Sequence, residues 1–417
     1  MATIKPFKGL RPPKDIAQNL ACLPYDVMNA AEAAEMAEGK DCSLLHITRS
    51  EIDLPEGTDV HSELVYNKSV ENFKNFQAQG WLVKEETAKY YVYAQTMDGR
   101  TQYGIVGAAA CQDYVDGIIK KHELTRPEKE EDRMILTRYT NANIEPVFFS
   151  YKAVPEIDEI VATVVNKTPA IYDFTAEDGF GHHFWVINDK QMNADLERLF
   201  AEKVPFTYVA DGHHRTAAAA LIGAEKTKQN PNHTGDESYN FFMAVHFPDN
   251  QLKIIDYNRV VKDLNGMSAD QLLENLEANF DIEKIGADIY KPAKLHEFSM
   301  YLNKNWYKLT AKAGTYDDSD PIGVLDVTIL SNLILDELLD IKDLRTSNRI
   351  EFVGGIRGLG ELSKRVDNGD MEVAFALYAV SMDQLINIAD TGNIMPPKTT
   401  WFEPKLRSGL VIHSLED

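Results

Sequence analysis

Apolar and polar residues follow one another along the chain in patterns that predict both helices and strands. A long amphipathic helix is predicted over residues 59–79, because one side of it carries Leu64, Val65, Val70, Phe73 and Phe76. Shorter apolar runs predict strands at 89–95, 104–112, 146–151, 170–175, 181–188, 240–247, 350–353 and 372–379. Further helices are predicted at 30–38, 128–139, 156–166, 189–201, 269–279, 325–339, 359–366 and 382–391. This mixed order favours an α+β (mixed α/β) fold over a clean doubly wound sheet.

The regions outside these elements also carry expectations. Residues 1–29 and the tail from residue 394 are expected to be irregular, because both are punctuated by proline. Short strands are expected near 306–309, inside an acidic region over 263–320. Alternation along the strand at 181–188 places His182 and His183 on opposite faces.

Composition narrows the class of protein. The 417 residues are 44% hydrophobic and 26% charged, which is typical of a globular protein, and they are too many for one ordinary core. A net charge of −22 argues against a nucleic-acid partner, which needs a basic face. Three cysteines suit a reducing compartment. No apolar run of membrane-spanning length or signal-peptide type occurs, so we expect a cytoplasmic protein without a membrane partner.

One short turn carries most of the candidate chemistry. Asp211, Gly212, His213, His214 and Arg215 follow a strand-like apolar run over 205–210 and precede a helix-like run over 216–223. Helix N-termini bind anions, glycine permits close backbone approach, and arginine can grip phosphate oxygens with two parallel hydrogen bonds. The pattern therefore predicts a phosphate-binding turn with an acid at its edge. The alternative is a loop in which Asp211 simply caps the helix.

A second charged loop lies at residues 120–127. It offers the carboxylate of Glu123, the imidazole of His122 and several cations, among them Arg126, directly before a predicted helix. A phosphotransferase needs cations for the phosphates and a carboxylate to accept the hydroxyl proton, which makes Glu123 the first candidate base and His122 the second. A solvated, charged helix start is the alternative interpretation.

Three further segments offer binding groups. The tail over 395–411 contains Lys398, Thr399 and Lys405, which could close over an anionic ligand, or the tail could be pinned to a core by its aromatic residues. Near the N-terminus, the Tyr25-Asp26 turn could orient a substrate amine or form a plain turn. After a strand-like segment, Arg259 could reach a phosphate or form a surface ion pair.

Taken in order, six motifs resemble the domain of unknown function 1015 (DUF1015) family over essentially the whole chain. They are Lys5–Pro12, Pro24–Val27, Lys121–Thr125, Ala210–Arg215, Tyr257–Arg259 and Pro397–Lys405. The turn over 211–215 also resembles the nucleotide-binding turn of the sulfiredoxin/ParB superfamily and of archaeal free-serine kinases. Sulfiredoxin needs a cysteine where His213 stands, so the resemblance implies a kinase and not a reductase.

The resemblance implies a fold and an activity. The expected fold has a sulfiredoxin/ParB-like nucleotide-binding core over 116–262, an N-terminal α/β region over 1–115, and a C-terminal α/β region over 263–417 with a functional tail. The implied activity is phosphoryl transfer from ATP or ADP, with Mg²⁺, to the hydroxyl of a small metabolite, L-serine giving phosphoserine being the first guess. The alternative is a non-catalytic nucleotide-binding regulator of ParB-like type. The oligomeric state stays open.

Residue roles follow from the same resemblance. Glu123 would act as base with His122 beside it, and Asp211 would lie near Mg²⁺ or the reacting hydroxyl. The expected nucleotide and phosphate contacts are Gly212, His213, His214, Arg215, Arg126, Lys398 and Lys405. The expected substrate contacts are Asp26, Tyr25, Thr399 and Arg259.

Overall fold

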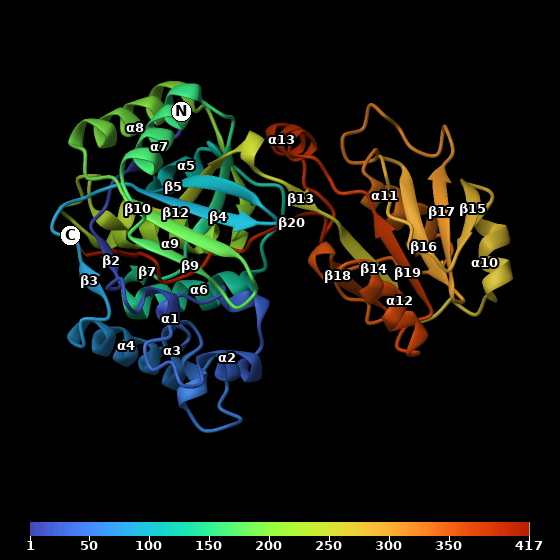
Figure 1. Ribbon diagram of the computed structural model, residues 1–417, viewed down its shortest axis with the longest axis horizontal. Coiled ribbons are helices and arrows are strands. Elements are labelled where there is room, and N and C mark those ends of the chain that lie inside the picture. The colour runs from blue at the N-terminus through green and yellow to red at the C-terminus, as the bar shows by residue number, and fades with distance from the viewer. Residues whose placement is uncertain (417) are drawn as a thin grey trace. The chain divides into compact units, whose positions relative to one another are not determined.

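A computed structural model describes residues 1–416 of the chain and has a mixed α/β fold, which confirms the predicted fold class (Figure 1). The chain divides into two compact units. The first unit comprises Met1–Leu252 and the C-terminal segment from Pro404, and the second comprises Lys253–Glu403. No helix among residues 1–416 is both long enough and apolar enough to cross a lipid bilayer.

The first unit is built on a nine-stranded mixed sheet. Its strand order is β6 (Ile119–Lys120), β11 (Thr207–Asp211), β8 (Val147–Tyr151), β12 (Phe241–Pro248), β5 (Arg100–Ala110), β4 (Tyr91–Met97), β10 (Gly181–Val186) and β9 (Tyr172–Thr175), with β1 (Ile4–Lys5) also paired to β5. Strand β11 runs parallel to β6 and antiparallel to β8, whereas β8 runs parallel to β12. Along β10, His182 is buried and His183 half-buried, as the predicted alternation requires.

Three longer helices pack on this sheet. Helices α7 (Pro155–Lys167) and α8 (Lys190–Lys203) contribute apolar residues to one core cluster, together with Val92, Ile105 and Trp185. Helix α9 (His213–Gln229) packs with α5 (Cys111–Val115) in a second cluster. Its alanine-rich first turns keep α9 close to the strands, because four consecutive alanines over 217–220 are buried.

Two segments expected to be irregular contain short elements instead. The N-terminal segment includes β2 (Gly9–Arg11) and α1 (Ala17–Leu20), and the C-terminal segment includes β21 (Ile412–Ser414). These strands join β3 (Val83–Lys84) and β7 (Ala142–Asn143) in a four-stranded sheet of order β3-β2-β21-β7. Strands of two or three residues are too short for an alternating pattern to be recognised, so the sequence prediction was wrong here.

Besides α1 and α5, residues 1–140 of the first unit contain four α-helices. They are α2 (Ala30–Ala37), α3 (Leu45–Thr48), α4 (Glu63–Ala78) and α6 (Pro127–Thr140). The predicted apolar face of α4 needs a correction. Leu64 is 56% exposed and Val70 is half-buried, because the buried face runs through Val65, Phe73 and Phe76, and Leu64 points about 100° away from Val65.

The second unit has a six-stranded antiparallel sheet. Its order is β15 (Phe280–Gly286), β17 (Asn305–Ala311), β16 (Glu297–Leu302), β19 (Val373–Leu377), β14 (Tyr257–Val261) and β18 (Ile350–Gly354), and β13 (Ile254–Ile255) pairs separately with β20 (Trp401–Phe402). Its α-helices are α10 (Ala269–Leu276), α11 (Asp326–Leu330), α12 (Gly360–Asp367) and α13 (Met382–Asp390). The helix predicted over 325–339 continues from α11 as a π-helical segment, Ser331–Asp336.

Candidate functional site

The sheet brings the two charged segments of the sequence to the same edge. Thr207 pairs with Ile119 and Tyr208 with Lys120 in the parallel β6–β11 ladder, so the loop after β6 and the turn after β11 leave the sheet side by side. The rings of His122 and His213 consequently meet edge to face, with their centroids 4.6 Å apart. The Oε2 atom of Glu123 lies 3.8 Å from Nδ1 of His213.

Gly212 is the N-cap residue of helix α9, and it is buried together with His213 and Arg215 of the first turn. Its backbone is left-handed, with φ +92°, no side chain caps the helix, and the first turn contains no acidic residue. A Cβ atom on Gly212 would lie 3.3 Å from Cζ of Arg215, so the Arg215 guanidinium folds back beside the helix start. The N–H groups of an uncapped helix start and a guanidinium close to it are both groups that can bind phosphate.

Asp211 is not a helix cap, because the N-cap residue is Gly212. Its Oδ2 atom accepts a hydrogen bond from Nζ of Lys405 at 2.9 Å, and the backbone of Lys405 is held by Gln95, whose Nε2 donates to the Lys405 carbonyl at 2.9 Å. Burial alone would raise the pKa of the Asp211 carboxyl, but the charges of Lys405 and Arg215 lower it well below its ordinary value. Asp211 is therefore ionised at neutral pH.

The histidines of the site are neutral at pH 7. Burial lowers the pKa of His122 to about 4, and burial together with the nearby His122 lowers that of His213 well below its ordinary value. Burial also lowers the pKa of His214, whose Nε2 accepts the backbone N–H of Arg126 at 3.0 Å. This hydrogen bond connects the start of α6 to the turn. Nε2 of His213, in contrast, is buried without a hydrogen-bond partner in the protein.

Sequence reasoning missed two buried residues of this region, Glu145 and Arg133. Glu145 is 8% exposed, and its Oε2 lies 3.5 Å from Nη1 of Arg133. The next residue, Pro146, accepts a hydrogen bond from Nη1 of Arg215, whose Nε is buried without a partner. Burial opposes the charge of Arg215, but Asp26, Glu145 and Asp211 together raise its pKa above the ordinary value. No local motif could reveal Glu145, because only the antiparallel pairing of β8 with β11 brings it to this edge.

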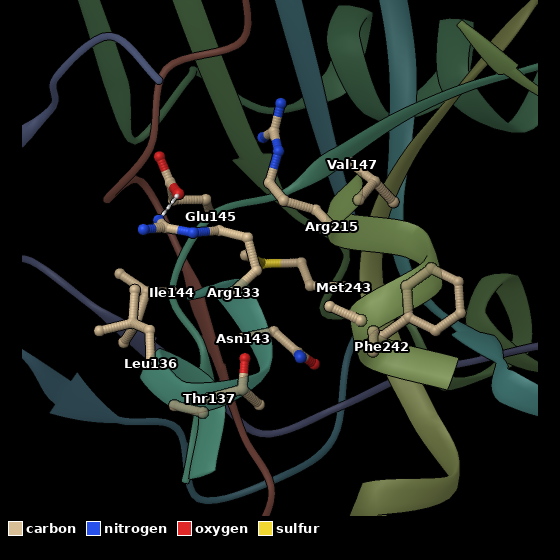
Figure 2. Close-up of a pocket in the computed structure, with 13 residues that line it drawn as sticks. Arg133, Leu136, Thr137, Asn143, Ile144, Glu145, Val147, Arg215, Phe242 and Met243 are labelled. Carbon is tan, nitrogen blue, oxygen red and sulfur yellow. Dashed lines mark hydrogen bonds and ion pairs between the residues drawn. The ribbon is translucent and has the colours of Figure 1, made fainter. Parts of the chain in front are cut away.

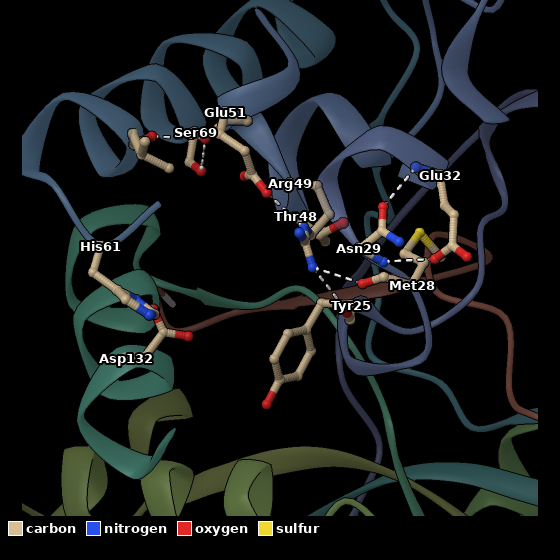
Figure 3. A network of polar contacts seen from close by, with 12 residues as sticks. Tyr25, Met28, Asn29, Glu32, Thr48, Arg49, Glu51, His61, Ser69 and Asp132 are labelled. Carbon is tan, nitrogen blue, oxygen red and sulfur yellow. Dashed lines mark hydrogen bonds and ion pairs between the residues drawn. The ribbon is translucent and has the colours of Figure 1, made fainter. Parts of the chain in front are cut away.

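The Tyr25-Asp26 turn also reaches this region. The backbone N–H of Tyr25 donates to Oε1 of Glu145 at 2.9 Å, and its ring lies under the guanidinium of Arg133, 3.7 Å from the ring centroid. Arg49 holds the turn by donating to the carbonyls of Tyr25 and Met28 at 2.9 and 3.0 Å (Figure 3). Burial raises the pKa of the Tyr25 hydroxyl to about 12, so this phenol stays protonated at neutral pH.

The remaining sequence candidates belong to the second unit. Arg259 is 1% exposed and donates to the carbonyls of Tyr257 and Lys398, the latter at 3.0 Å. The ammonium of Lys398 lies 5.6 Å from the centroid of the Tyr257 ring, and Thr399 donates to the carbonyl of Pro396. Arg259 is thus buried, and the expectation of a surface ion pair at this residue was wrong.

Residues 1–416 contain no cluster of three or more His, Cys, Asp or Glu side chains arranged to hold a metal ion. Asp211 instead offers a single ionised carboxylate whose charge Lys405 balances. A single carboxylate can be one ligand of an ion such as Mg²⁺, whose remaining ligands are typically water and substrate phosphates.

Comparison with known proteins gives distant structures and one family. No curated protein matches the chain. A conserved hypothetical protein from Pyrococcus furiosus is 14% identical, with a TM-score of 0.34 over 74% of this chain and 95% of that one. A free serine kinase in complex with AMP is 11% identical, with a TM-score of 0.33 over 74% and 92%. SbnI with a C-terminal truncation, from Staphylococcus aureus, is 10% identical, with a TM-score of 0.37 over 73% and 87%.

The family match covers most of the first unit and part of the second. The sequence profile described as "Protein of unknown function (DUF1015)" matches residues 4–328, which include the 120–127 loop and the 211–215 turn but not the tail motif at 397–405. Because this match spans well over half of the chain, the protein belongs to the DUF1015 family.

Proposed function

We propose that the protein is a phosphotransferase that uses a nucleotide, ATP or ADP, to phosphorylate the hydroxyl of a small free metabolite, with L-serine as the first candidate acceptor. The observation that carries the proposal is the start of α9. There an uncapped helix N-terminus, the left-handed Gly212 and the folded-back guanidinium of Arg215 converge beside the ionised Asp211. Phosphoryl transfer depends mainly on positioning and charge stabilisation, and this cluster supplies both.

Each residue near the turn has a role in this proposal. The first-turn N–H groups and Arg215 would hold the nucleotide phosphates, with Lys405 and Arg126 as further cations at the same edge. Glu123, whose side chain is 44% exposed, is reachable by an acceptor and would take its proton. In the reaction the acceptor oxygen bonds to the terminal phosphorus, the bond from that phosphorus to the bridging oxygen breaks, and the hydroxyl proton passes to Glu123.

Asp211 would hold a magnesium ion by a single carboxylate oxygen, and the bound ion would offset the negative charge of the phosphates. Asp26 and Tyr25 are proposed on the acceptor side. The charge of Asp26 acts on Arg215, and the backbone N–H of Tyr25 donates to Glu145. Within the second unit, Lys398 stays a proposed phosphate contact, and Thr399 and Arg259 stay proposed substrate contacts.

The test is direct. Purified protein would be incubated with ATP or ADP, Mg²⁺ and free hydroxylated metabolites led by L-serine, and phosphorylated products would be followed by mass spectrometry. We expect phosphoserine or another phosphorylated member of the panel. Nucleotide binding without any product would instead favour the non-catalytic, ParB-like regulator.

A matched pair of variants tests the base. Glu123→Gln should abolish turnover, while the dissociation constant for ADP, measured by calorimetry, should stay within twofold of wild type. Glu128→Gln is the control, because Glu128 is an exposed carboxylate in the first turn of α6, five residues away. Full turnover in Glu123→Gln would show that another group accepts the proton.

A further inference from the structure

A cavity lies beside Arg215, which is one of the residues that line it (Figure 2). It has a volume of about 40 Å³, is open on one side and is lined by residues of α6, α9, β7 and the starts of β8 and β12. One side is polar, with Arg133, Glu145 and Thr137, and another is apolar, with Phe242 and Met243. One water needs roughly 10–15 Å³ of such space, so the cavity holds a group of only a few atoms.

The cavity shares a wall with the catalytic turn. Arg215 belongs to the turn and also lines the cavity, and its Nη1 donates to the carbonyl of Pro146, the residue after Glu145. The Tyr25 backbone, which carries Asp26 beside it, donates to the same Glu145 carboxylate at 2.9 Å. A ligand in the cavity would therefore lie next to the residues that we propose to hold the phosphates.

The charged groups of the cavity are not fully satisfied by one another. Nη1 of Arg133 and Oε2 of Glu145 are 3.5 Å apart, whereas charge-assisted hydrogen bonds between such groups measure roughly 2.7–2.9 Å. The other nitrogens of Arg133, Nε and Nη2, donate to Asp132, so Nη1 is the nitrogen that faces Glu145. Because Oε1 of Glu145 already accepts from Tyr25, a ligand with one positive and one negative group would add direct partners to Oε2 of Glu145 and Nη1 of Arg133, whose mutual contact is long.

We propose that this cavity binds the ammonium and carboxylate head group of a small zwitterionic amino acid, in which Glu145 binds the ammonium and Arg133 binds the carboxylate. The inference rests on the proposed kinase activity and names the acceptor class, a free hydroxy-amino acid as opposed to a sugar alcohol. The small volume suits a head group of a few atoms, and the apolar residues Phe242 and Met243 offer no hydrogen-bond partners for a polyol.

The first test is charge selectivity. The ratio of kcat/KM for L-serine to that for N-acetyl-L-serine, which lacks the ammonium, would be measured in wild type, Glu145→Gln and Glu131→Gln. We expect the ratio to fall at least tenfold in Glu145→Gln alone. Glu131→Gln is the matched control, because Glu131 is an exposed carboxylate on the same helix as Arg133 that pairs with Arg138. An unchanged ratio in folded Glu145→Gln would overturn the inference, since a purely structural carboxylate affects both substrates alike.

A second variant covers the case in which Glu145→Gln does not fold. Thr137→Leu keeps the helix and fills the cavity without touching its charges. We expect KM for L-serine to rise at least tenfold while the ADP dissociation constant stays within twofold. An unchanged KM would overturn the inference, because filling an unused cavity leaves acceptor binding intact.

The same proteins separate failure of this inference from failure of the proposed function. If wild type phosphorylates no acceptor, binding of L-serine in the presence of ADP would be measured by calorimetry. Binding to wild type and at least tenfold weaker binding to Thr137→Leu would sustain the amino-acid site without the kinase, and no binding to wild type would overturn both.

Discussion

Gly212 gives the sharpest test of the phosphate-binding turn, through the substitution Gly212→Ala. Two effects add at this position. A left-handed backbone costs an L-residue about 1–2 kcal/mol, and the new Cβ lies 3.3 Å from Cζ of Arg215, so the guanidinium must move. A lost hydrogen bond to a charged group costs about 1.5–3 kcal/mol, so the dissociation constant for ADP should rise roughly 10- to 100-fold.

Gly39→Ala is the matched control for the backbone effect. Gly39 lies in the same unit with φ +71°, and a Cβ there has open space around it. Gly39→Ala should lower the free energy of unfolding in urea titrations by about 1–2 kcal/mol, and Gly212→Ala should lower it by at least as much because Arg215 must also move. Only Gly212→Ala should also lose ADP affinity, measured by calorimetry at a temperature where both proteins are folded.

The outcome that refutes this reasoning is equally specific. If Gly212→Ala and Gly39→Ala bind ADP with the same affinity as wild type, the start of α9 does not hold the phosphates. A loss of affinity in both variants would instead attribute the effect to general destabilisation of the unit.

Three further predictions concern charge and burial. Lys405→Met should raise the pKa of Asp211 and lower the free energy of unfolding by about 1–3 kcal/mol at pH 7, and urea titrations from about pH 5 to about pH 2 should show this deficit shrink, because the contribution of the ionised carboxylate is lost as pH falls towards its strongly lowered folded pKa. Burial raises the pKa of Asp326 to about 7, so the stability that its protonated carboxyl contributes is fully present below pH ~4 and is lost as pH rises through about 7. Urea titrations between about pH 4 and about pH 8 should therefore show the free energy of unfolding decline by up to ~4 kcal/mol, and Asp326→Asn should lack this decline. Burial also raises the pKa of the Cys111 thiol to about 12, so mass spectrometry should show Cys111 unmodified by iodoacetamide at pH 8 until denaturant is added.

Local sequence patterns predicted the elements that carry the turn, since a strand does end at Asp211 and a helix does begin directly after Gly212. The apolar run that predicts the strand, the glycine of the turn and the alanine-rich segment that predicts the helix are all local signals in the sequence. The same patterns failed for β15 and β16 in the second unit, where charged residues such as Lys284 and Glu297 break the alternation. They also overestimated the apolar face of α4 at Leu64, because a single apolar residue one position off the face looks the same in sequence.

The candidate site was predictable only where its residues share a segment. Glu123 and Asp211 could be named from their own loops, but their shared edge follows from the parallel pairing of β6 with β11. Glu145 could not be named, since its position depends on β8 running antiparallel to β11 and on a register that no local pattern specifies. Lys405 was one of several cations in the tail, and only the structure selects it as the partner of Asp211.

The pairing of charges explains how an acidic protein can hold an anion. With a net charge of −22, the chain repels phosphate at long range, so attraction must come from cations held close to the turn. Lys405 and Arg215 are such cations, and in the free protein the carboxylate of Asp211 acts on both. Because an incoming phosphate competes with Asp211 for these groups, nucleotide binding should strengthen when a cation engages that carboxylate. This coupling gives a physical reason why magnesium and nucleotide would bind together at this site and weakly when apart.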